Sequence, residues 1–144
     1  MSEALSSAGQ APVTLNSVLA FETVEVGPEL ARAKAEIGDQ HRQPYGIVHG
    51  GVYAALAESI ASEATAIAVY EDGNIALGMS NFVSFMRPMS SGTIHAEARR
   101  RHAGSSTWVW EVDMTDDQGR LCAASRVTVA VRPQPQERSP GSGS

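Results

Sequence analysis

One uninterrupted helical segment constrains what this chain can fold into. Residues 52–70 contain neither proline nor glycine, and their large apolar side chains recur at helical spacing. Such a run predicts a single helix of about five turns. Asp72 and Gly73 then provide a turn signal that ends it. A helix of this length must cover its apolar face with other elements, so the flanking segments decide the fold class.

Strand patterns surround this helix. Apolar and polar side chains alternate with the period of two that is typical of β-strands. The predicted strands are residues 21–26, 30–37, 75–87, 93–101, 107–115 and 121–131, and a short helix over 14–20 precedes them. Short turns join the later strands, which indicates antiparallel pairing. The sequence therefore predicts an α+β domain in which one antiparallel sheet packs on one long helix.

Length and composition fit a single globular domain. The chain has 144 residues, of which 42% are hydrophobic. We expect the folded domain to cover residues 13–133, between disordered tails at residues 1–12 and 134–144. The net charge of −5 argues against general nucleic-acid binding. The single cysteine, Cys122, excludes an internal disulfide, and the four histidines lack zinc spacing, so we expect no metal.

The sequence also predicts a cytoplasmic protein that does not enter a membrane. Its first twelve residues lack the charged and apolar regions of a signal peptide. No uninterrupted apolar run reaches the ~20 residues that span a bilayer.

The side of the helix opposite its bulky apolar residues carries mostly small side chains. The bulky face is formed by Val52, Tyr53, Leu56, Ile60 and Ile67, and the opposite side by Ala54, Ala55, Glu58, Ala61, Ser62, Thr65 and Val69. Because a solvent-facing helix normally carries several charges, we infer that the same helix of a second subunit covers this side. A solvated Glu58 on an alanine-rich helix is the alternative. Glu63 projects near the middle of the bulky face, where an arginine could pair with it, although the sequence indicates no particular one.

A histidine and two glycines precede the helix. His49, Gly50 and Gly51 lie where the first helical turn leaves backbone N–H groups free. The helix dipole makes such an end suitable for binding an anion or polarising a carbonyl oxygen, and a flexible hinge is the alternative. Glu58 lies roughly 12 Å further along the helix axis at 1.5 Å per residue. If Gly50 and Glu58 serve one site, Glu58 must come from a second subunit of a symmetric dimer.

Several motifs between residues 13 and 133 occur together in one enzyme family. They are Gln-Pro-Tyr-Gly-Ile-Val-His-Gly-Gly at 43–51, Leu-Ala-Glu-Ser at 56–59, and the segments 84–88, 102–108 and 119–123. This pattern resembles the hotdog-fold acyl-CoA thioesterases, and most closely the 4-hydroxybenzoyl-CoA thioesterase type. The menaquinone-pathway 1,4-dihydroxy-2-naphthoyl-CoA thioesterases share much of it, whereas the phenylacetate-pathway relatives carry aspartate in place of the glutamate. The resemblance implies a sheet wrapped around the helix, edge-to-edge dimers and, usually, homotetramers.

The resemblance also implies the catalytic residues. Glu58 would attack the thioester carbonyl or activate the water that attacks it. The Gly50 N–H of the facing subunit would hold the carbonyl oxygen. Gln43 would assist near the acyl group or the water, and His49 would orient the loop. Ser62 stands where the family carries a threonine, and it keeps the hydroxyl.

Substrate contacts are implied at four further positions, namely Gly51, Arg87, Ser105 and Ser106. The last three match family positions that contact the nucleotide and phosphates of coenzyme A. Pro135 stands where the family has a nucleotide-contacting arginine. Arg132 or Arg138 would therefore have to supply that contact.

We therefore expect hydrolysis of an aromatic acyl-CoA to the free acid and coenzyme A, without a cofactor. The 4-hydroxybenzoyl thioester is the first candidate, and the 1,4-dihydroxy-2-naphthoyl and phenylacetyl thioesters are alternatives. Two other functions occur on such a scaffold: hydration or dehydration of an acyl-CoA, and acyl-CoA binding without turnover. Product analysis separates them, since only hydrolysis releases a free thiol.

Overall fold

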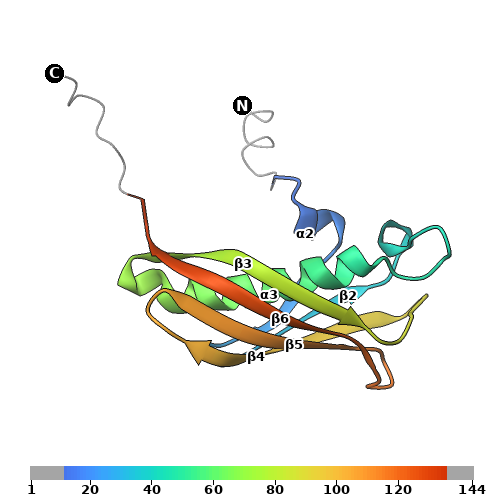
Figure 1. Cartoon of the computed structure of the whole chain (residues 1–144). Helices are drawn as coiled ribbons and strands as arrows, with labels where there is room; N and C mark the ends of the chain where they lie inside the picture. The colour runs from blue at the N-terminus through green and yellow to red at the C-terminus, as the bar shows by residue number, and fades with distance from the viewer. Residues whose placement is uncertain (1–11, 136–144) are drawn as a thin grey trace, which may run out of the picture.

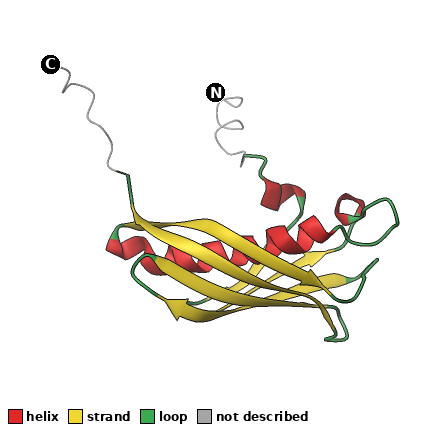
Figure 2. Ribbon diagram, viewed as in Figure 1, coloured by secondary structure: helices red, strands yellow, loops and turns green. Residues whose placement is uncertain are grey.

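A computed structural model describes residues 12–135 of the chain. A six-stranded antiparallel sheet with the order β1-β2-β4-β5-β6-β3 curves around one long helix, α3 (Gly50–Val69), as Figures 1 and 2 show. The strands are β1 (Glu22–Val26), β2 (Leu30–Glu36), β3 (Asn74–Phe85), β4 (Thr93–Ala103), β5 (Thr107–Thr115) and β6 (Leu121–Pro133). The short helix α2 (Leu15–Val18) precedes β1, and single 3-10 turns cover Asp39–His41 and Tyr70–Asp72.

This arrangement confirms the predicted α+β architecture, and every expected strand is present. The long helix begins two residues earlier than predicted, at Gly50. His49 caps it there, because its Nδ1 accepts a hydrogen bond of 2.8 Å from the Gly51 N–H. The predicted tails lie outside the described residues, apart from Pro12, Gln134 and Pro135.

The buried face of α3 is a spiral, so the predicted faces of the helix are partly wrong. Buried side chains recur every four positions at Val52 and Tyr53, Leu56 and Ala57, Ile60 and Ala61, Ala64 and Thr65, and Val69. Four residues exceed one helical turn by about 40°, so this stripe winds around the helix along the twisted sheet. Ala61, Thr65 and Val69 are therefore buried within the subunit. Ile67, which was expected to face the sheet, is 58% exposed.

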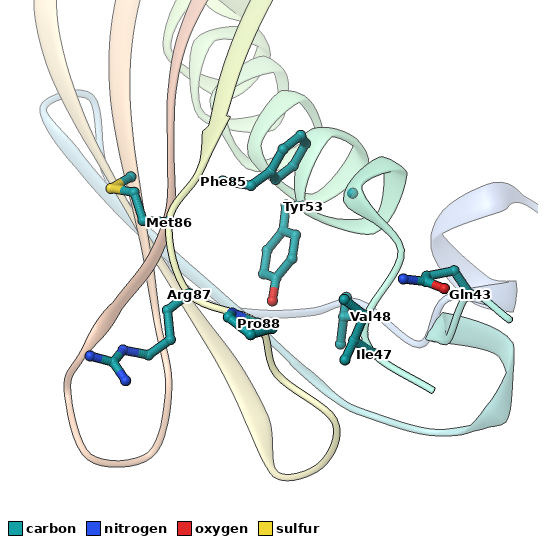
Figure 3. Close-up of a pocket in the computed structure, with 9 residues that line it drawn as sticks. Gln43, Ile47, Val48, Tyr53, Phe85, Met86, Arg87 and Pro88 are labelled. Atoms are coloured by element: carbon teal, nitrogen blue, oxygen red, sulfur yellow. The ribbon is translucent and has the colours of Figure 1, made fainter. Parts of the chain in front are cut away.

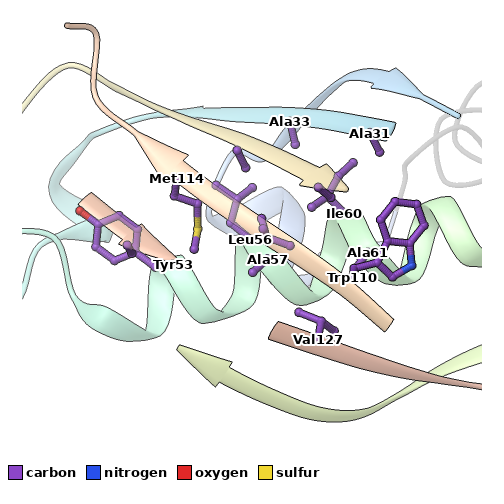
Figure 4. Close-up of a cluster of buried hydrophobic side chains, with 14 of the residues drawn as sticks. Ala31, Ala33, Tyr53, Leu56, Ala57, Ile60, Ala61, Trp110, Met114 and Val127 are labelled. Carbon is purple, nitrogen blue, oxygen red and sulfur yellow. The ribbon is translucent and has the colours of Figure 1, made fainter. Parts of the chain in front are cut away.

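Small and large side chains alternate in the core between α3 and the sheet. Figure 4 shows alanines of β2 and α3 beside the large side chains of β5 and β6. The predicted inner face of β5 is confirmed, since Trp108, Trp110, Val112 and Met114 are all buried. The Trp110 indole N–H donates to Thr65 Oγ1 at 2.9 Å, and the Thr65 hydroxyl donates to the Ala61 carbonyl at 2.8 Å. These two bonds connect β5 to the middle of the helix.

Glu63 has a partner that the sequence did not indicate. The Thr23 hydroxyl on β1 donates to Glu63 Oε2 at 2.8 Å. On the same helix, the Ser59 hydroxyl donates to Asn16 Oδ1 of α2 at 2.9 Å. Both bonds lie at the rim of the core, so the N-terminal elements are tied to α3 by polar contacts.

Strand β3 forms one edge of the sheet and carries exposed apolar side chains. It pairs with β6 on one side, and no strand of the described chain pairs with its other side. Leu77, Met79, Phe82 and Phe85 are each more than half exposed on this strand. A long, apolar and unpaired edge is a surface on which another strand can add.

The helical segment Gly50–Asp72 is, within the described chain, the one stretch long and apolar enough to cross a membrane. Half of its most apolar 18-residue window is buried inside the domain. Its apolar side chains are therefore used by the core of this fold rather than facing outward as in a membrane helix.

Replacing Thr65 with valine keeps the side-chain volume and removes the acceptor of the Trp110 N–H. We expect the free energy of unfolding to fall by about 1–3 kcal/mol, because a buried donor without a partner carries its desolvation cost. Urea denaturation followed by circular dichroism measures this change. In a Trp110→Phe background the same substitution should cost much less, and an equal cost in both backgrounds would show that this bond contributes nothing.

Candidate active site

A buried histidine fixes the loop that leads into α3. The ring of His41 is fully buried; its Nδ1 accepts the Gly38 N–H at 2.8 Å and its Nε2 donates to the Leu19 carbonyl at 2.6 Å. This pairing assigns the ring hydrogen to Nε2. The His41 carbonyl accepts the His49 N–H at 2.8 Å. Sequence analysis missed this role, because nothing local connects His41 with the distant Leu19.

Gly50 presents a free backbone N–H at the start of α3. The His49 side chain accepts the Gly51 N–H, and the His49 carbonyl accepts the Val52 N–H at 3.0 Å. The Gly50 N–H finds no acceptor within residues 12–135. The Gly51 N–H could bind substrate only if its hydrogen bond to His49 Nδ1 broke. The Gly50 N–H is therefore the available donor. The helix dipole adds to its ability to stabilise a partly negative oxygen.

A mostly apolar cavity opens beside Gly50. It holds about 480 Å³ and is lined by Gln43, Ile47, Val48, Gly50, Tyr53, Phe85, Met86, Arg87 and Pro88. Figure 3 shows Gln43 and Arg87 on opposite sides, with the rings of Tyr53 and Phe85 between them. Gln43 Oε1 accepts the Tyr45 N–H, which leaves the Gln43 NH₂ group free to donate. The size and the apolar lining are typical of a small-molecule site.

The Phe85 ring packs closely against Gly50, which has no side chain of its own. A Cβ atom on Gly50 would lie 2.7 Å from Cζ of Phe85, which is far inside van der Waals contact. Phe85 also packs on Tyr53, with ring centroids 6.1 Å apart and an interplanar angle of 49°. The glycine therefore lets an aromatic wall stand directly beside the free N–H.

Two buried groups near the cavity keep their protons. Burial raises the pKa of Tyr53 to about 12, and the nearby Cys122 adds to the rise. Burial also raises the pKa of the Cys122 thiol, and Asp116 contributes in the same direction. Cys122 is completely buried. It is thus a small core residue, as predicted, and not a thiolate nucleophile.

The Glu58 carboxylate lies in a notch of the edge strand. It is an exposed side chain, and a Cβ atom on Gly78 of β3 would lie only 3.1 Å from its Cδ. The β3–β6 register shifts between Gly78 and Ser80, so the notch coincides with a bulge. Within the described residues no hydrogen bond or ion pair engages this carboxylate. Gly78 is a site residue that sequence analysis missed, and a glycine within a strand was the available signal.

Asn81 holds β3 against the helix next to this notch. Its Nδ2 donates to the Ala54 carbonyl at 2.8 Å, and its Oδ1 accepts the Ser125 hydroxyl at 2.6 Å. Sequence analysis missed Asn81 as well. One turn beyond Glu58, the Ser62 hydroxyl is buried and has no partner in the described chain. Within the described residues of one subunit, the Ser62 hydroxyl therefore makes no hydrogen bond with the Glu58 carboxylate that it was predicted to assist.

Within one chain the predicted residues form two separate groups. Gln43, His49 and Gly50 lie at the start of α3, with Arg87 in the same cavity. Glu58 lies roughly 12 Å away along the helix axis.

The predicted coenzyme A contacts are also divided. Ser105 and Ser106 lie in the β4–β5 turn. The Ser106 carbonyl accepts a hydrogen bond of 2.7 Å from Nη1 of Arg132. This turn lies near the first residues of β3, because Asn74 pairs with Pro133 beside Arg132. Arg87 lies just beyond the last residue of β3. That strand has 12 residues, which separates the two groups by roughly 40 Å.

Comparison with known proteins identifies the family. The model of the Thioesterase superfamily matches residues 45–123. The proofreading thioesterase EntH of Cronobacter turicensis is 34% identical over 118 residues, covering 82% of this chain and 85% of that protein. The 1,4-dihydroxy-2-naphthoyl-CoA hydrolase of Listeria monocytogenes is 34% identical over 118 residues, covering 82% and 95%. This chain belongs to the thioesterase superfamily.

Solved structures agree with this assignment. A thioesterase from Haemophilus influenzae superposes on this thioesterase with a TM-score of 0.81 at 30% identity, covering 88% of this chain and 87% of that one. Two variants of a Staphylococcus aureus protein superpose with TM-scores of 0.79 and 0.80 at 27% and 28% identity. One has a glutamine and the other a glutamate replaced by alanine, at positions fifteen residues apart. The protein thus has the hotdog fold and is a thioester hydrolase that acts on acyl-CoA.

Replacing Gly78 with alanine tests whether the notch positions Glu58. The added methyl group would press on the Glu58 carboxyl group and displace it by a few tenths of an ångström. We expect kcat for thioester hydrolysis to fall roughly tenfold, because misplacement by about 1 Å can cost about 10²-fold. Thiol release measures kcat, and thermal denaturation should show an unchanged fold. Ser80→Ala, on the other side of the bulge, is the control; full kcat in Gly78→Ala would mean that the notch does not position the carboxylate.

Proposed function

We propose that this protein hydrolyses aromatic acyl-CoA thioesters, with Gly50 of one subunit and Glu58 of its partner acting on the same thioester. The observation that carries the proposal is the free N–H of Gly50, a residue that lines an apolar cavity of about 480 Å³. Such a donor stabilises the negative charge that develops on the thioester oxygen during attack. The aromatic wall of Tyr53 and Phe85 fits a flat, ring-containing acyl group.

Glu58 can start the reaction in two ways. A carboxylate oxygen can attack the thioester carbon, expel coenzyme A as its thiolate and form an acyl-glutamyl anhydride, which water then hydrolyses. Alternatively, Glu58 removes a proton from a water molecule that attacks the same carbon. Gly50 holds the oxyanion in both routes, and the thiolate leaves without help from a strong acid. Incorporation of labelled oxygen from water in a single turnover distinguishes them.

The spacing of two residues supports this assignment. Gln43 and Glu58 are fifteen residues apart, as are the glutamine and the glutamate that were replaced in the Staphylococcus aureus protein. In the proposal the free NH₂ group of Gln43 binds the acyl group or the attacking water. His49 keeps the Gly50 N–H free by capping the helix through Gly51. These groups, with Ser62 near the carboxylate, need no metal or cofactor.

The second subunit is proposed to add at the exposed edge of β3. An antiparallel copy of β3 would extend the sheet and cover the apolar side chains of this edge. It would also bring the notch that holds Glu58 next to the other subunit's cavity.

The direction of the side chains defines a register for this pairing. Directly opposed residues of antiparallel strands point to the same face, and Gly78 and Phe85 both face α3. Pairing Gly78 with Phe85 of the other subunit would bring Glu58 beside the other subunit's Gly50. The bulge between Gly78 and Ser80 contains one extra residue, Met79, which is left out of the pairing. Counting pairs inward from Gly78 and Phe85 then puts Phe82 opposite Phe82 of the other subunit. The two-fold axis would therefore pass beside Phe82, whose side chain is 78% exposed and available to pack against its own copy.

The same pairing would unite the coenzyme A contacts. The end of β3 near Arg87 would approach the partner's β4–β5 turn, which holds Ser105 and Ser106. Pro135 lacks the cation expected near the nucleotide, and Arg138 lies outside the described residues. We therefore propose Arg132, which is bound to the Ser106 carbonyl, as the substitute. Assembly into tetramers and a cytoplasmic location complete this proposal.

The acyl group is proposed from the cavity and from the relatives. The 4-hydroxybenzoyl group fits the motif resemblance. The 1,4-dihydroxy-2-naphthoyl group is the second candidate, because the Listeria relative is named for it. A panel of both thioesters with benzoyl-, phenylacetyl- and fatty acyl-CoA ranks these substrates.

Replacing Glu58 with glutamine removes the charge and keeps the shape. We expect kcat to fall by at least about 10²-fold with the oligomer intact, because neither direct attack nor proton abstraction remains possible. The thiol-release assay and light scattering measure activity and assembly. Glu63→Gln is the matched control on the same helix, since Glu63 binds Thr23. Near-normal turnover of Glu58→Gln would reject the assignment.

A cysteine at position 82 tests the proposed dimer. In a Cys122→Ser background, Phe82→Cys should form a covalent dimer on oxidation, because opposed Cα atoms lie about 4.5–5.5 Å apart, within disulfide range. Non-reducing electrophoresis measures the product. The control is Ser84→Cys, whose own copy would lie about 13 Å away, four residues along the strand. A covalent dimer at position 84 and none at position 82 would exclude this register.

A further inference from the structure

Tyr53 carries a hydroxyl group for which the chain provides no partner. Its side chain is only 3% exposed, and within the described residues its oxygen accepts and donates no hydrogen bond. Buried polar groups in folded proteins are nearly always paired, so an unpaired phenol needs an explanation. The Cys122 thiol lies near enough to affect Tyr53, but it donates to the Arg120 carbonyl at 3.4 Å.

The position of this hydroxyl connects it with the cavity. Tyr53 is three residues beyond Gly50 on α3, and both residues line the same cavity. Figure 4 shows the ring at the end of the core cluster with its oxygen pointing away from that cluster. Figure 3 shows the oxygen pointing between Val48 and Pro88, whose side chains offer it no hydrogen bond. An acyl group whose carbonyl oxygen binds the Gly50 N–H would extend alongside this ring.

We propose that Tyr53 determines acyl specificity, by forming a hydrogen bond with a hydroxyl group on the aromatic ring of the substrate. This inference rests on the proposed function and narrows it to hydroxyaryl acyl-CoA thioesters. A plain phenyl ring or an alkyl chain offers no partner and leaves the phenol unpaired. A site built to hydrogen-bond a substrate hydroxyl discriminates against the analogue that lacks it. Tyr53 keeps its proton at physiological pH, so it is available as a donor.

Tyr53→Phe removes the hydroxyl and keeps the ring. The test compares kcat/KM for benzoyl-CoA with that for the 2-, 3- and 4-hydroxybenzoyl thioesters, and for 2-naphthoyl-CoA with that for 1,4-dihydroxy-2-naphthoyl-CoA. We expect the wild type to prefer at least one hydroxylated substrate over its parent by roughly tenfold, the worth of one hydrogen bond. Tyr53→Phe should lose this preference, because its kcat/KM should fall more for the hydroxylated substrate than for the parent.

Two further measurements separate specificity from packing. The melting temperature of ligand-free Tyr53→Phe should equal or exceed that of the wild type, because an unpaired buried hydroxyl is removed. Tyr45→Phe is the matched control, since Tyr45 is 92% exposed on the preceding loop and should leave the preference unchanged.

The outcomes distinguish this inference from the proposed function. If the wild type hydrolyses these thioesters without preferring a hydroxylated ring, or if Tyr53→Phe lowers kcat/KM equally for all of them, the role of Tyr53 is wrong and the thioesterase proposal stands. A preference that survives in Tyr53→Phe overturns the role of Tyr53 in the same way. If the wild type releases no thiol from any of these aromatic thioesters, the proposed function fails, and this inference fails with it.

Discussion

The close packing of one helix inside a twisted sheet determines the rest of this structure. The buried stripe of α3 winds around the helix because buried residues recur every four positions, from Val52 to Val69. Alanines allow the backbones to approach, and Trp110 anchors the middle of the helix through Thr65. A helix held along its whole length has a fixed starting point, and this rigidity keeps the Gly50 N–H at one wall of the cavity.

The same packing explains why the site is divided. A helix fixes the axial separation of its residues, so Gly50 and Glu58 cannot approach each other within one chain. The sheet ends at β3, whose exposed apolar edge lies beside both residues: Phe85 touches Gly50, and Gly78 receives Glu58. Pairing of two such edges would cover the exposed apolar side chains of β3. It would also bring Gly50 of one subunit and Glu58 of the other into one site.

Unpaired polar groups occur at three positions of α3 between Gly50 and Ser62. The Gly50 N–H, the Tyr53 hydroxyl and the Ser62 hydroxyl all lack partners in the described chain, whereas the rest of the core pairs its polar groups. Unpaired groups reduce stability, so these positions, Gly50 and Tyr53 at the cavity and Ser62 further along the helix, fit places where substrate or a second subunit completes the bonds. The carboxylate of Glu58, likewise free of ion pairs, belongs to the same set.

The sequence by itself determined the fold class and the order of the strands along the chain, because periodicity is a local property. Its motif resemblance singled out Gln43, His49, Gly50 and Glu58, whose catalytic roles are proposed. Only the tertiary structure decided which helical residues are buried, since the twist of the sheet moves the contact stripe and exposes Ile67. It also decided the partners of Glu63 and His41, the notch at Gly78 and the unpaired Tyr53 hydroxyl. These features depend on residues far apart in the chain, and no local pattern encodes such contacts.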